Sequence, residues 1–239
     1  MENSIYIGLS RQVALRRQLD VVANNIANMT TPGFKGQDVL FQQYMAGGTG
    51  DDSYSMVSDY GSYRDTRSGP VARTDNPLDV AIEGNGFLVV ETAQGPRYTR
   101  SGRMSIGPDR QLVDSNGLPI LGEGDAPIEI PENATDITIA ADGTISNVNE
   151  QIGRLKIVRF EREQFLTEQG RGLFTSTEPP QPVQDPRVRQ GSLESSNVQP
   201  IIEMTRMIEL QRQYQSAQKL LETEHETQRN AISKLSRLS

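Results

Sequence analysis

The C-terminal segment constrains the fold of this chain more than any other sequence feature. From residue 201 to residue 238 it contains neither Pro nor Gly. A helix over residues 198–238 would be about 60 Å long at a rise of 1.5 Å per residue. A single small domain cannot bury a helix of that length, so its apolar face needs a partner helix. That face repeats at steps of three and four residues, with Met207, Leu210, Tyr214, Ala217 and Leu221.

The N-terminal segment offers such a partner. Residues 4–29 contain no Pro and a single Gly, Gly8, before Pro32 and Gly33 end the predicted helix. Its apolar positions from residue 15 onward are spaced by four, three and four residues, which is the a/d spacing of a coiled-coil seam. The apolar positions on this predicted face are Ile5, Leu15, Leu19, Val22 and Ile26.

Three asparagines, Asn24, Asn25 and Asn28, lie near the end of the N-terminal helix. Asn has a low helix propensity, so their presence here needs an explanation. Two interpretations stay open at this point. The amides bind backbone carbonyl groups or a neighbouring chain, or they are exposed polar positions at a fraying helix end.

The centre of the chain, residues 70–193, has the pattern of short β-strands separated by turns. Gly84-Asn85-Gly86 lies between the apolar runs 80–82 and 87–90, which predicts a β-hairpin with a positive φ at Gly86. Short strands at this spacing are typical of a small barrel or sandwich. The further strand candidates are Met104–Ile106, Gln111–Val113, Ile128–Ile130, Ile137–Ala140, Thr144–Ser146 and Ile152–Phe160.

The sequence therefore predicts an α+β fold, with N- and C-terminal helices that pair as a coiled coil and a central all-β domain of short strands. Hydrophobic residues make up only 35% of the chain, so the core is thin and part of the apolar surface is expected to be buried against other chains. The predicted segments are a helix at 1–35, a Gly/Ser/Tyr-rich connection at 36–69, a β domain at 70–175, a Pro-rich linker at 176–197 and a helix at 198–239.

The composition argues against several functions. The chain has no Cys and a single His, His225, which excludes disulfides, a thiol nucleophile and a multi-His metal site within one chain. The net charge of -7 and the absence of Trp disfavour binding to nucleic acid. No apolar run approaches the length that inserts into a membrane, and residues 1–4 do not resemble a signal peptide. We therefore predict no catalytic residue, cofactor or metal site.

Six motifs, in order along the chain, resemble those of the bacterial flagellar rod and hook proteins. The N-terminal signature is Asn-Asn-Ile-Ala-Asn at 24–28 followed by Thr-Pro-Gly-Phe-Lys at 31–35. Asn76–Phe87 resembles the start of the central domain of these proteins. Gly191–Val198 resembles the segment that introduces their C-terminal helix, and Met207–Arg212 resembles a pattern within that helix. The two remaining motifs are Tyr98–Gly102 and Leu112–Gly117.

This resemblance implies a structural subunit of the flagellar basal-body rod, the periplasmic drive shaft that transmits torque from motor to hook. It implies export by the flagellar type III apparatus without a cleaved signal peptide. The partners would be other rod proteins and further copies of the chain in a helical assembly. The opening residues 2–10 resemble the proximal-rod members, and the distal-rod members are the alternative. A cytoplasmic coiled-coil adaptor and a carboxylate-dependent hydrolase are competing hypotheses from other classes.

The two helix faces are the candidate assembly interface. Their residues are Ile5, Leu15, Leu19, Val22, Ile26, Met207, Leu210, Tyr214, Ala217 and Leu221.

Overall fold

The computed structural model describes residues 2–46, 54–132, 134, 136–148 and 150–235. The chain divides into two compact units. The helix–hairpin unit comprises Met1–Ala27, Gln37–Asp65 and Gln199–Ser239, and the β unit comprises Asn28–Gly36 and Thr66–Val198.

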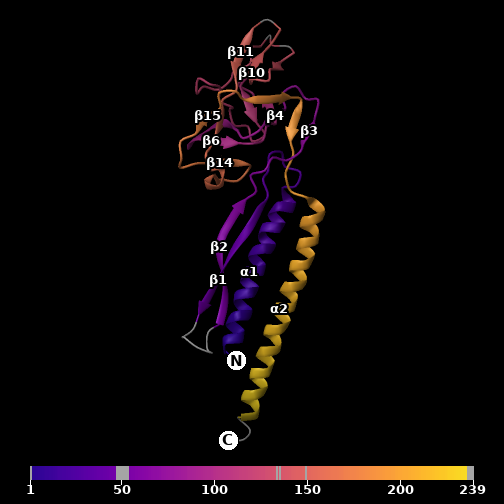
Figure 1. The fold of residues 1–239 in the computed structure, drawn as a ribbon. Helices are drawn as coiled ribbons and strands as arrows, with labels where there is room; N and C mark the ends of the chain where they lie inside the picture. The colour runs from indigo at the N-terminus through magenta and orange to yellow at the C-terminus, as the bar shows by residue number, and fades with distance from the viewer. Residues whose placement is uncertain (1, 47–53, 133, 135, 149, 236–239) are drawn as a thin grey trace. The chain divides into compact units, whose positions relative to one another are not determined.

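The helix–hairpin unit contains two helices and one long antiparallel hairpin (Figure 1). Helix α1 spans Glu2–Ala27 and helix α2 spans Pro200–Leu235. Strands β1 (Gln37–Ala46) and β2 (Tyr54–Arg64) pair along their length, with a register shift between Leu40 and Phe41. The helices run antiparallel, and α1 contacts α2 as well as both strands of the hairpin.

The predicted coiled-coil pairing of the terminal helices is wrong, although the α+β class agrees with the structure. A two-stranded coiled coil would bury a single stripe of α1. Instead, α1 lies between α2 and the hairpin, so Val21 and Asn25 are buried in addition to the a/d positions Leu15 and Val22. The three-four spacing indicates an apolar stripe, and such a stripe fits packing against one helix within a three-element unit equally well.

The β unit is built from short antiparallel strands. Its largest sheet has six strands in the order β13-β14-β6-β5-β12-β15, and the others have two or three strands. A 3-10 helix, η1, spans Glu163–Phe165. The strands are β3 (Val71–Arg73), β4 (Val80–Glu83), β5 (Phe87–Thr92), β6 (Gly95–Thr99), β7 (Met104–Ile106), β8 (Leu112–Asp114), β9 (Thr138–Ile139), β10 (Thr144–Ser146), β11 (Gln151–Arg154), β12 (Ile157–Arg159), β13 (Thr167–Glu168), β14 (Leu173–Thr175), β15 (Gln181–Pro182), β16 (Arg187–Gln190) and β17 (Ser192–Glu194).

Several predicted strands agree with the structure, and two do not. The predicted strand Ile152–Phe160 is two strands, β11 and β12, which belong to different sheets. The predictions Met104–Ile106 and Thr144–Ser146 coincide with β7 and β10. At Ile128–Ile130 the structure has an isolated bridge between Glu129 and Gln111 in place of a strand. Ile128 and Ile130 are nevertheless buried in the core. The alternation of apolar residues therefore predicted burial correctly, although no neighbouring strand pairs with this segment over its whole length.

The predicted hairpin at Gly84-Asn85-Gly86 is also wrong. Strand β4 pairs with β16, whereas β5 pairs with β6 and β12, so the turn joins two different sheets. Gly84 adopts the positive φ, at 86°. Gly86 is required for a different reason, because a Cβ there would lie 2.9 Å from Cγ2 of Ile157. The glycine pattern therefore reflects one left-handed residue and one close packing contact.

The β unit has a well-filled interior. One cluster of buried aliphatic side chains includes Leu88, Leu112, Ile120 and Leu155. A second cluster is aromatic, with Tyr98 and Phe160 in an edge-on arrangement at a centroid distance of 4.8 Å. Phe87 makes similar edge-on contacts to Phe160 and Phe174, each at 5.9 Å. Such pairs stabilise a core by about 0.5–1.5 kcal/mol beyond their buried area.

Candidate assembly interface

The predicted interface residues lie mostly at the contact between α1 and α2. Leu15, Val22, Leu210 and Ala217 form a buried cluster. We call this contact the helix seam. Residues of both helices pack against the cluster, namely Leu19, Ile26, Met207 and Tyr214.

The predicted interface residues Ile5 and Leu221 lie at the other end of the two helices. Leu221 is half-buried and approaches Gly8 so closely that a Cβ on Gly8 would lie 2.8 Å from Cδ2 of Leu221. The absence of a side chain at Gly8 thus allows the two helices to approach each other. The side chain of Ile5 lies outside the described part of the structure.

Asn25 ties the hairpin to α1. Its amide nitrogen donates a 2.8 Å hydrogen bond to the carbonyl of Gln37, and its amide oxygen accepts a 2.9 Å bond from the N–H of Gln37. The same amide nitrogen donates to the carboxylate of Glu203 on α2, at 3.3 Å. The side chain is buried, so these bonds replace the lost contact with water. This confirms the interpretation that an asparagine amide binds backbone groups, and it explains a polar residue on a buried helix face.

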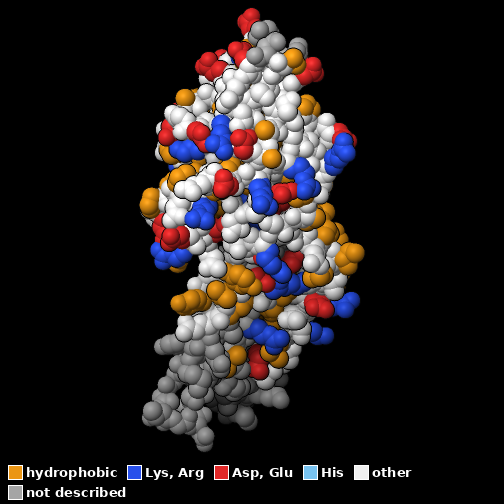
Figure 2. Space-filling view, turned by 45° about the horizontal axis from the view of Figure 1, so that its top comes forward, with side chains coloured by type: hydrophobic (Ala, Val, Ile, Leu, Met, Phe, Trp, Pro, Cys, Tyr) orange, Lys and Arg blue, Asp and Glu red, His pale blue; other side chains and the backbone are white. Residues whose placement is uncertain are grey.

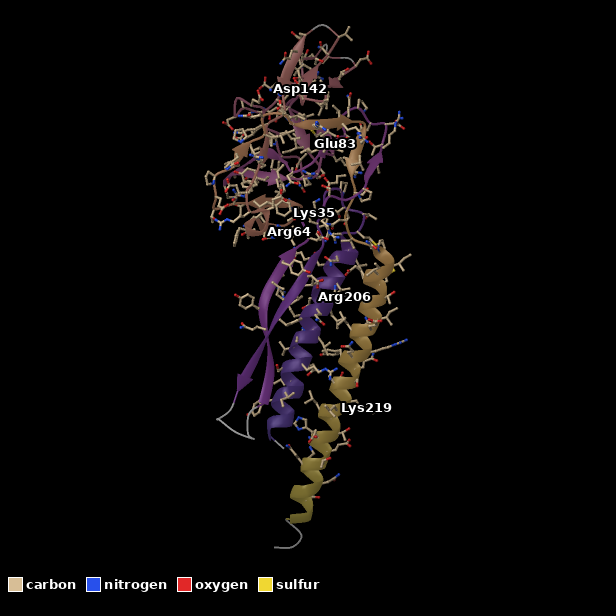
Figure 3. All side chains as sticks on the ribbon, in the orientation of Figure 1. Lys35, Arg64, Glu83, Asp142, Arg206 and Lys219 are labelled. Carbon is tan, nitrogen blue, oxygen red and sulfur yellow. The ribbon has the colours of Figure 1, made fainter. Side chains whose placement is uncertain are left out.

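A second link joins α2 to the hairpin. The guanidinium of Arg206, labelled in Figure 3, donates two hydrogen bonds to the carboxylate of Asp38, at 2.7 and 3.1 Å. This bidentate geometry raises the pKa of Arg206 above its ordinary value, chiefly through the hydrogen bond to Asp38. Both side chains are about one-third exposed, so the pair contributes more to the register of the elements than to their stability.

The outer faces of both helices expose large apolar side chains. On α1 these include Tyr6, Leu9 and Val13, and on α2 they include Ile201, Met204 and Ile208. The exposed fraction reaches 60% at Val13 and 81% at Ile201. Figure 2 shows hydrophobic side chains, in orange, that reach the surface in the lower part of the view among basic ones. Scattered exposed residues are common in proteins, but a run at helical spacing is typical of an interaction surface.

The β unit contains a buried group of charges that the sequence analysis did not find. Glu194 on β17 accepts a 2.5 Å bond from Nζ of Lys35 and a 2.6 Å bond from Nε of Arg100. It also accepts a 2.9 Å bond from the N–H of Gly69. All three charged side chains are nearly inaccessible to solvent. We call Lys35, Arg100 and Glu194 the buried charge triad.

In the buried charge triad, burial and ion pairing shift the pKa values of Glu194 and Lys35 in opposite directions. Burial alone would raise the pKa of Glu194, but Arg100 and Lys35 outweigh it and hold that pKa below its ordinary value. Burial lowers the pKa of Lys35, labelled in Figure 3, and the bond to Glu194 opposes this only in part. Arg100 is satisfied further by the carbonyl groups of Ile82, Gly84 and Gly86.

Asn197 adds a further connection near Glu194 in the chain. Its amide oxygen accepts a 2.7 Å bond from the N–H of Gly36, and its amide nitrogen donates a 3.0 Å bond to the carbonyl of Arg67. Together with the triad, Asn197 joins residues 28–36, 66–70 and 192–198 into one layer of the β unit. The chain segments that leave the β unit after residue 36, enter it at residue 66 and leave it after residue 198 are therefore held by bonds to Glu194 or Asn197.

The described residues contain no group of three or more His, Asp or Glu side chains placed to hold a metal ion. None of the helices in that part of the chain is both long and apolar enough to cross a membrane. His225 lies exposed on α2, beside a shallow hollow lined by Glu222, Glu226 and Arg229. The main features of the described structure are the side-chain bonds that join the helices to the hairpin and the apolar residues exposed on both helices. Both features are expected of a subunit in a larger assembly.

Comparison with known proteins also indicates an assembly subunit, because three family models match segments of the chain. A family described as "Flagella basal body rod protein" matches residues 5–35. "Flagellar hook protein FlgE/F/G D1 domain" matches residues 81–147, and "Flagellar basal body rod FlgEFG protein C-terminal" matches residues 189–234. The matched segments cover α1, part of the β unit and most of α2.

Full-length relatives extend this result. The chain is 39% identical to the flagellar basal-body rod protein FlgF of Caulobacter vibrioides, over 100% of both chains. It is 35% identical to FlgF of Salmonella typhimurium over 99% of both chains. It is 31% identical to the rod protein FlgG of Bacillus subtilis, over 95% of this chain and 96% of the relative.

The chain belongs to the flagellar basal-body rod protein family. The resemblance inferred from the motifs is thereby confirmed, and so is the role of a structural rod subunit. Members of this family are structural proteins, and the chain is not an enzyme. Its place is the basal body of the flagellum, in assembly with other rod components.

Proposed function

We propose that the chain is a proximal-rod subunit of the periplasmic drive shaft, in which it transmits torque by contacts with neighbouring subunits. The similarity to FlgF proteins along the whole chain supports the proximal position over the distal one. The observation that carries the mechanical role is the set of apolar side chains exposed on the outer faces of both helices. Such side chains are stabilised when a neighbouring subunit covers them.

In this proposal the helix seam contributes to assembly by holding α1 and α2 together as one block. The ten predicted interface residues then act through the alignment of the helices and through their outward neighbours on the same helices. The bonds of Asn25 and Arg206 add the hairpin to this block. A block whose elements cannot slide past one another can pass torque between subunits.

The proposal includes other rod proteins and further copies of this chain as partners in a helical assembly. It also includes export by the flagellar type III apparatus, without a cleaved signal peptide. The family membership supports both points. Helices that bury only a thin seam gain much of their order on assembly, which suits a chain that is exported before it assembles.

A deletion strain tests the proposed position. Cells that lack the chain should not swim, and their purified basal bodies should have an incomplete proximal rod and no distal rod when viewed by electron microscopy. Complementation with a tagged chain should return the tag to the basal-body fraction. Basal bodies that carry a complete proximal rod without a distal rod in the deletion strain would assign the chain to the distal rod instead. A tag found only in the cytoplasm would contradict the whole proposal.

A further inference from the structure

The turn that joins β4 to β5 contains a chemically reactive dipeptide, Asn85-Gly86. An asparagine that precedes a glycine can lose its side-chain amide, because the backbone nitrogen of the glycine attacks the side-chain carbonyl carbon and closes a five-membered imide ring. Glycine hinders this approach least, since it has no Cβ. The reaction requires a side-chain amide and a following N–H group that are not held by other hydrogen bonds.

Both reacting groups of this dipeptide meet that requirement. The side chain of Asn85 is exposed, and no described residue forms a hydrogen bond with its amide. The N–H of Gly86 likewise has no acceptor in the described part of the chain. Asn85 also borders a hollow of about 200 Å³ whose wall includes Thr66 and Phe160, so water reaches the amide.

Arg100 places a positive charge beside the same turn. Its guanidinium donates hydrogen bonds to the carbonyl groups of Ile82, Gly84 and Gly86. The peptide group that joins Asn85 to Gly86 therefore lies between two peptide groups that contact the cation. A nearby cation stabilises the negative charge that forms first on the Gly86 nitrogen and then on the attacked oxygen, so this turn favours ring closure.

A second dipeptide of the same type, Asn116-Gly117, lies in a turn that holds both reacting groups. The side-chain amide of Asn116 donates a 2.9 Å hydrogen bond to the carboxylate of Asp114 and a 3.2 Å bond to the carbonyl of Arg171. The N–H of Gly117 donates a 3.1 Å bond to the carbonyl of Asp114. These bonds have to break before the ring can close, so the fold protects one dipeptide and leaves the other open.

We propose that Asn85 is a site of spontaneous deamidation, with water as the co-reactant and hydroxide ion as the base. Hydroxide removes the amide proton of Gly86, and the electron pair left on that nitrogen forms a bond to Cγ of Asn85. The π electrons of the attacked carbonyl move to Oδ1. When this oxyanion collapses, the bond between Cγ and Nδ2 breaks, and Nδ2 takes a proton from water and leaves as ammonia, which regenerates hydroxide.

Water then opens the imide ring at one of two bonds. Cleavage between the ring nitrogen and Cγ gives an ordinary aspartate at position 85. Cleavage between the ring nitrogen and the main-chain carbonyl carbon gives an isoaspartyl residue, whose main chain runs through the former side chain. No atom is oxidised or reduced in either case. The isoaspartyl product adds one carbon to the main chain between the carbonyl groups of Gly84 and Gly86, so it displaces the acceptors of Arg100.

Mass spectrometry of the purified full chain, aged in solution, tests the site. The chain is incubated at neutral and at mildly alkaline pH and then digested at mildly acidic pH, where the reaction stops. In the folded chain, Asn85 should deamidate at least about tenfold faster than Asn116, whose hydrogen bonds have to break first. The rate at Asn85 should rise about tenfold per pH unit, because the deprotonated fraction of the amide rises by that factor.

Two controls separate the effect of the fold from that of the sequence. In guanidinium chloride the hydrogen bonds of Asn116 are lost, so both dipeptides should react at similar rates. Asn85→Gln keeps an amide at the exposed position, but its longer side chain would have to close a larger ring. This variant should lose the reaction at position 85 and keep the slow reaction at Asn116.

Equal rates at Asn85 and Asn116 in the folded chain would overturn the proposal. A preference for Asn85 that persists unchanged in guanidinium chloride would overturn it too, since the fold then has no part in the selectivity. An enzyme that methylates isoaspartyl carboxylates identifies the product at position 85.

Thermal melts test the structural consequence. Aged wild-type chains should melt about 2–4 °C below fresh ones, the shift that a modest destabilisation gives in a chain of this size. Aged Asn85→Gln chains should melt like fresh ones. An isoaspartyl-containing chain with an unchanged melting temperature would show that Arg100 keeps its acceptors, and would overturn this consequence.

Discussion

The β unit and the helix–hairpin unit differ in how much apolar surface they bury for themselves. The β unit fills two clusters with aliphatic and aromatic side chains, of which Leu88, Leu112 and Ile120 are completely inaccessible. In the helix–hairpin unit the buried seam cluster consists of Leu15, Val22, Leu210 and Ala217, while apolar side chains of similar size stay exposed on the same helices.

This difference separates two sources of stability. The β unit has the burial that a small domain needs to fold alone, whereas the helix–hairpin unit relies on tie points and, in the proposed assembly, on surfaces that a neighbour covers. A protein that must fold and then join an assembly can divide these tasks between two parts of the chain. Four predictions test the division, from the largest expected effect to the smallest.

The largest effect is expected from Leu210→Asp in the helix seam. An uncompensated carboxylate buried between helices costs about 3–5 kcal/mol, which exceeds what the thin seam can absorb. We expect complete loss of swimming with an unchanged melting temperature of the β unit. Motility assays and thermal melts of the purified chain measure the two effects separately.

The matched control for this variant is Gln211→Asp, which introduces the same charge at the adjacent exposed position. It should leave swimming close to the wild-type level. If Leu210→Asp swims normally, the seam is not required for assembly. If it lowers the melting temperature of the β unit, the two units are not energetically separate.

The next effect concerns the buried charge triad. Glu194→Ala leaves Lys35 and Arg100 buried without their shared carboxylate, which should lower the free energy of unfolding of the β unit by about 3–5 kcal/mol. Urea titration of the purified chain measures this change. Glu83→Ala, which removes the solvent-exposed partner of Arg189, should cost at most about 1 kcal/mol. Equal effects of the two variants would show that burial of the triad is unimportant.

A smaller effect is expected at the turn between β4 and β5. Gly86→Val forces a side chain against Ile157 and should destabilise the β unit by about 1–3 kcal/mol through overpacking. Gly84 has open space around it but a positive φ, so Gly84→Asn should be tolerated, since Asn adopts this conformation more readily than most residues. Thermal melts in which Gly84→Asn is the more harmful variant would reverse this assignment of roles.

The smallest effect is the acid dependence of the β unit. Lys35 and Arg100 hold the pKa of Glu194 below its ordinary value of about 4.5. A carboxyl group with a lowered pKa contributes stability that is fully present above that value and is lost as the pH falls through the pKa of the folded state. The unfolding free energy should therefore decline below about pH 4.5, and Glu194→Gln should flatten the decline. Parallel slopes for the two chains would place the dependence on other carboxylates.

The sequence predicted the helices and much of the strand content because both depend on local patterns. Periodic apolar residues and the lack of Pro and Gly indicate α2 directly. The role of Asn25 stayed open between two interpretations, which the hydrogen bonds to Gln37 then separated. The hairpin β1–β2 was missed. Its second strand contains Gly61, three Ser and one Asp, and this composition is also typical of a linker. Its pairing with β1 and its contact with α1 are tertiary interactions, which cannot be predicted from composition.

The buried charge triad could not be predicted for a different reason. Lys35 and Glu194 are 159 residues apart, and Arg100 and Glu194 are 94 residues apart. No local pattern connects residues at such separations, and each charge taken alone is typical of a solvated surface. Only the crossing of three chain segments in the folded β unit brings them together. Lys35 and Glu194 each lie in a motif of the family, but the motifs do not indicate that the two side chains form an ion pair.

The long separation between Lys35 and Glu194 also has a consequence in time. Ribosomes extend a chain by about 5–20 residues per second, so the 159 residues between the two partners take about 8–32 s to synthesise. Throughout that interval, the ammonium group of Lys35 has no carboxylate from β17 to bind. The layer of the β unit that contains the triad is thus completed only when the last few residues of that unit, which ends at Val198, have been synthesised. A nascent chain of this protein therefore cannot complete its β unit until about four-fifths of the 239 residues have been synthesised.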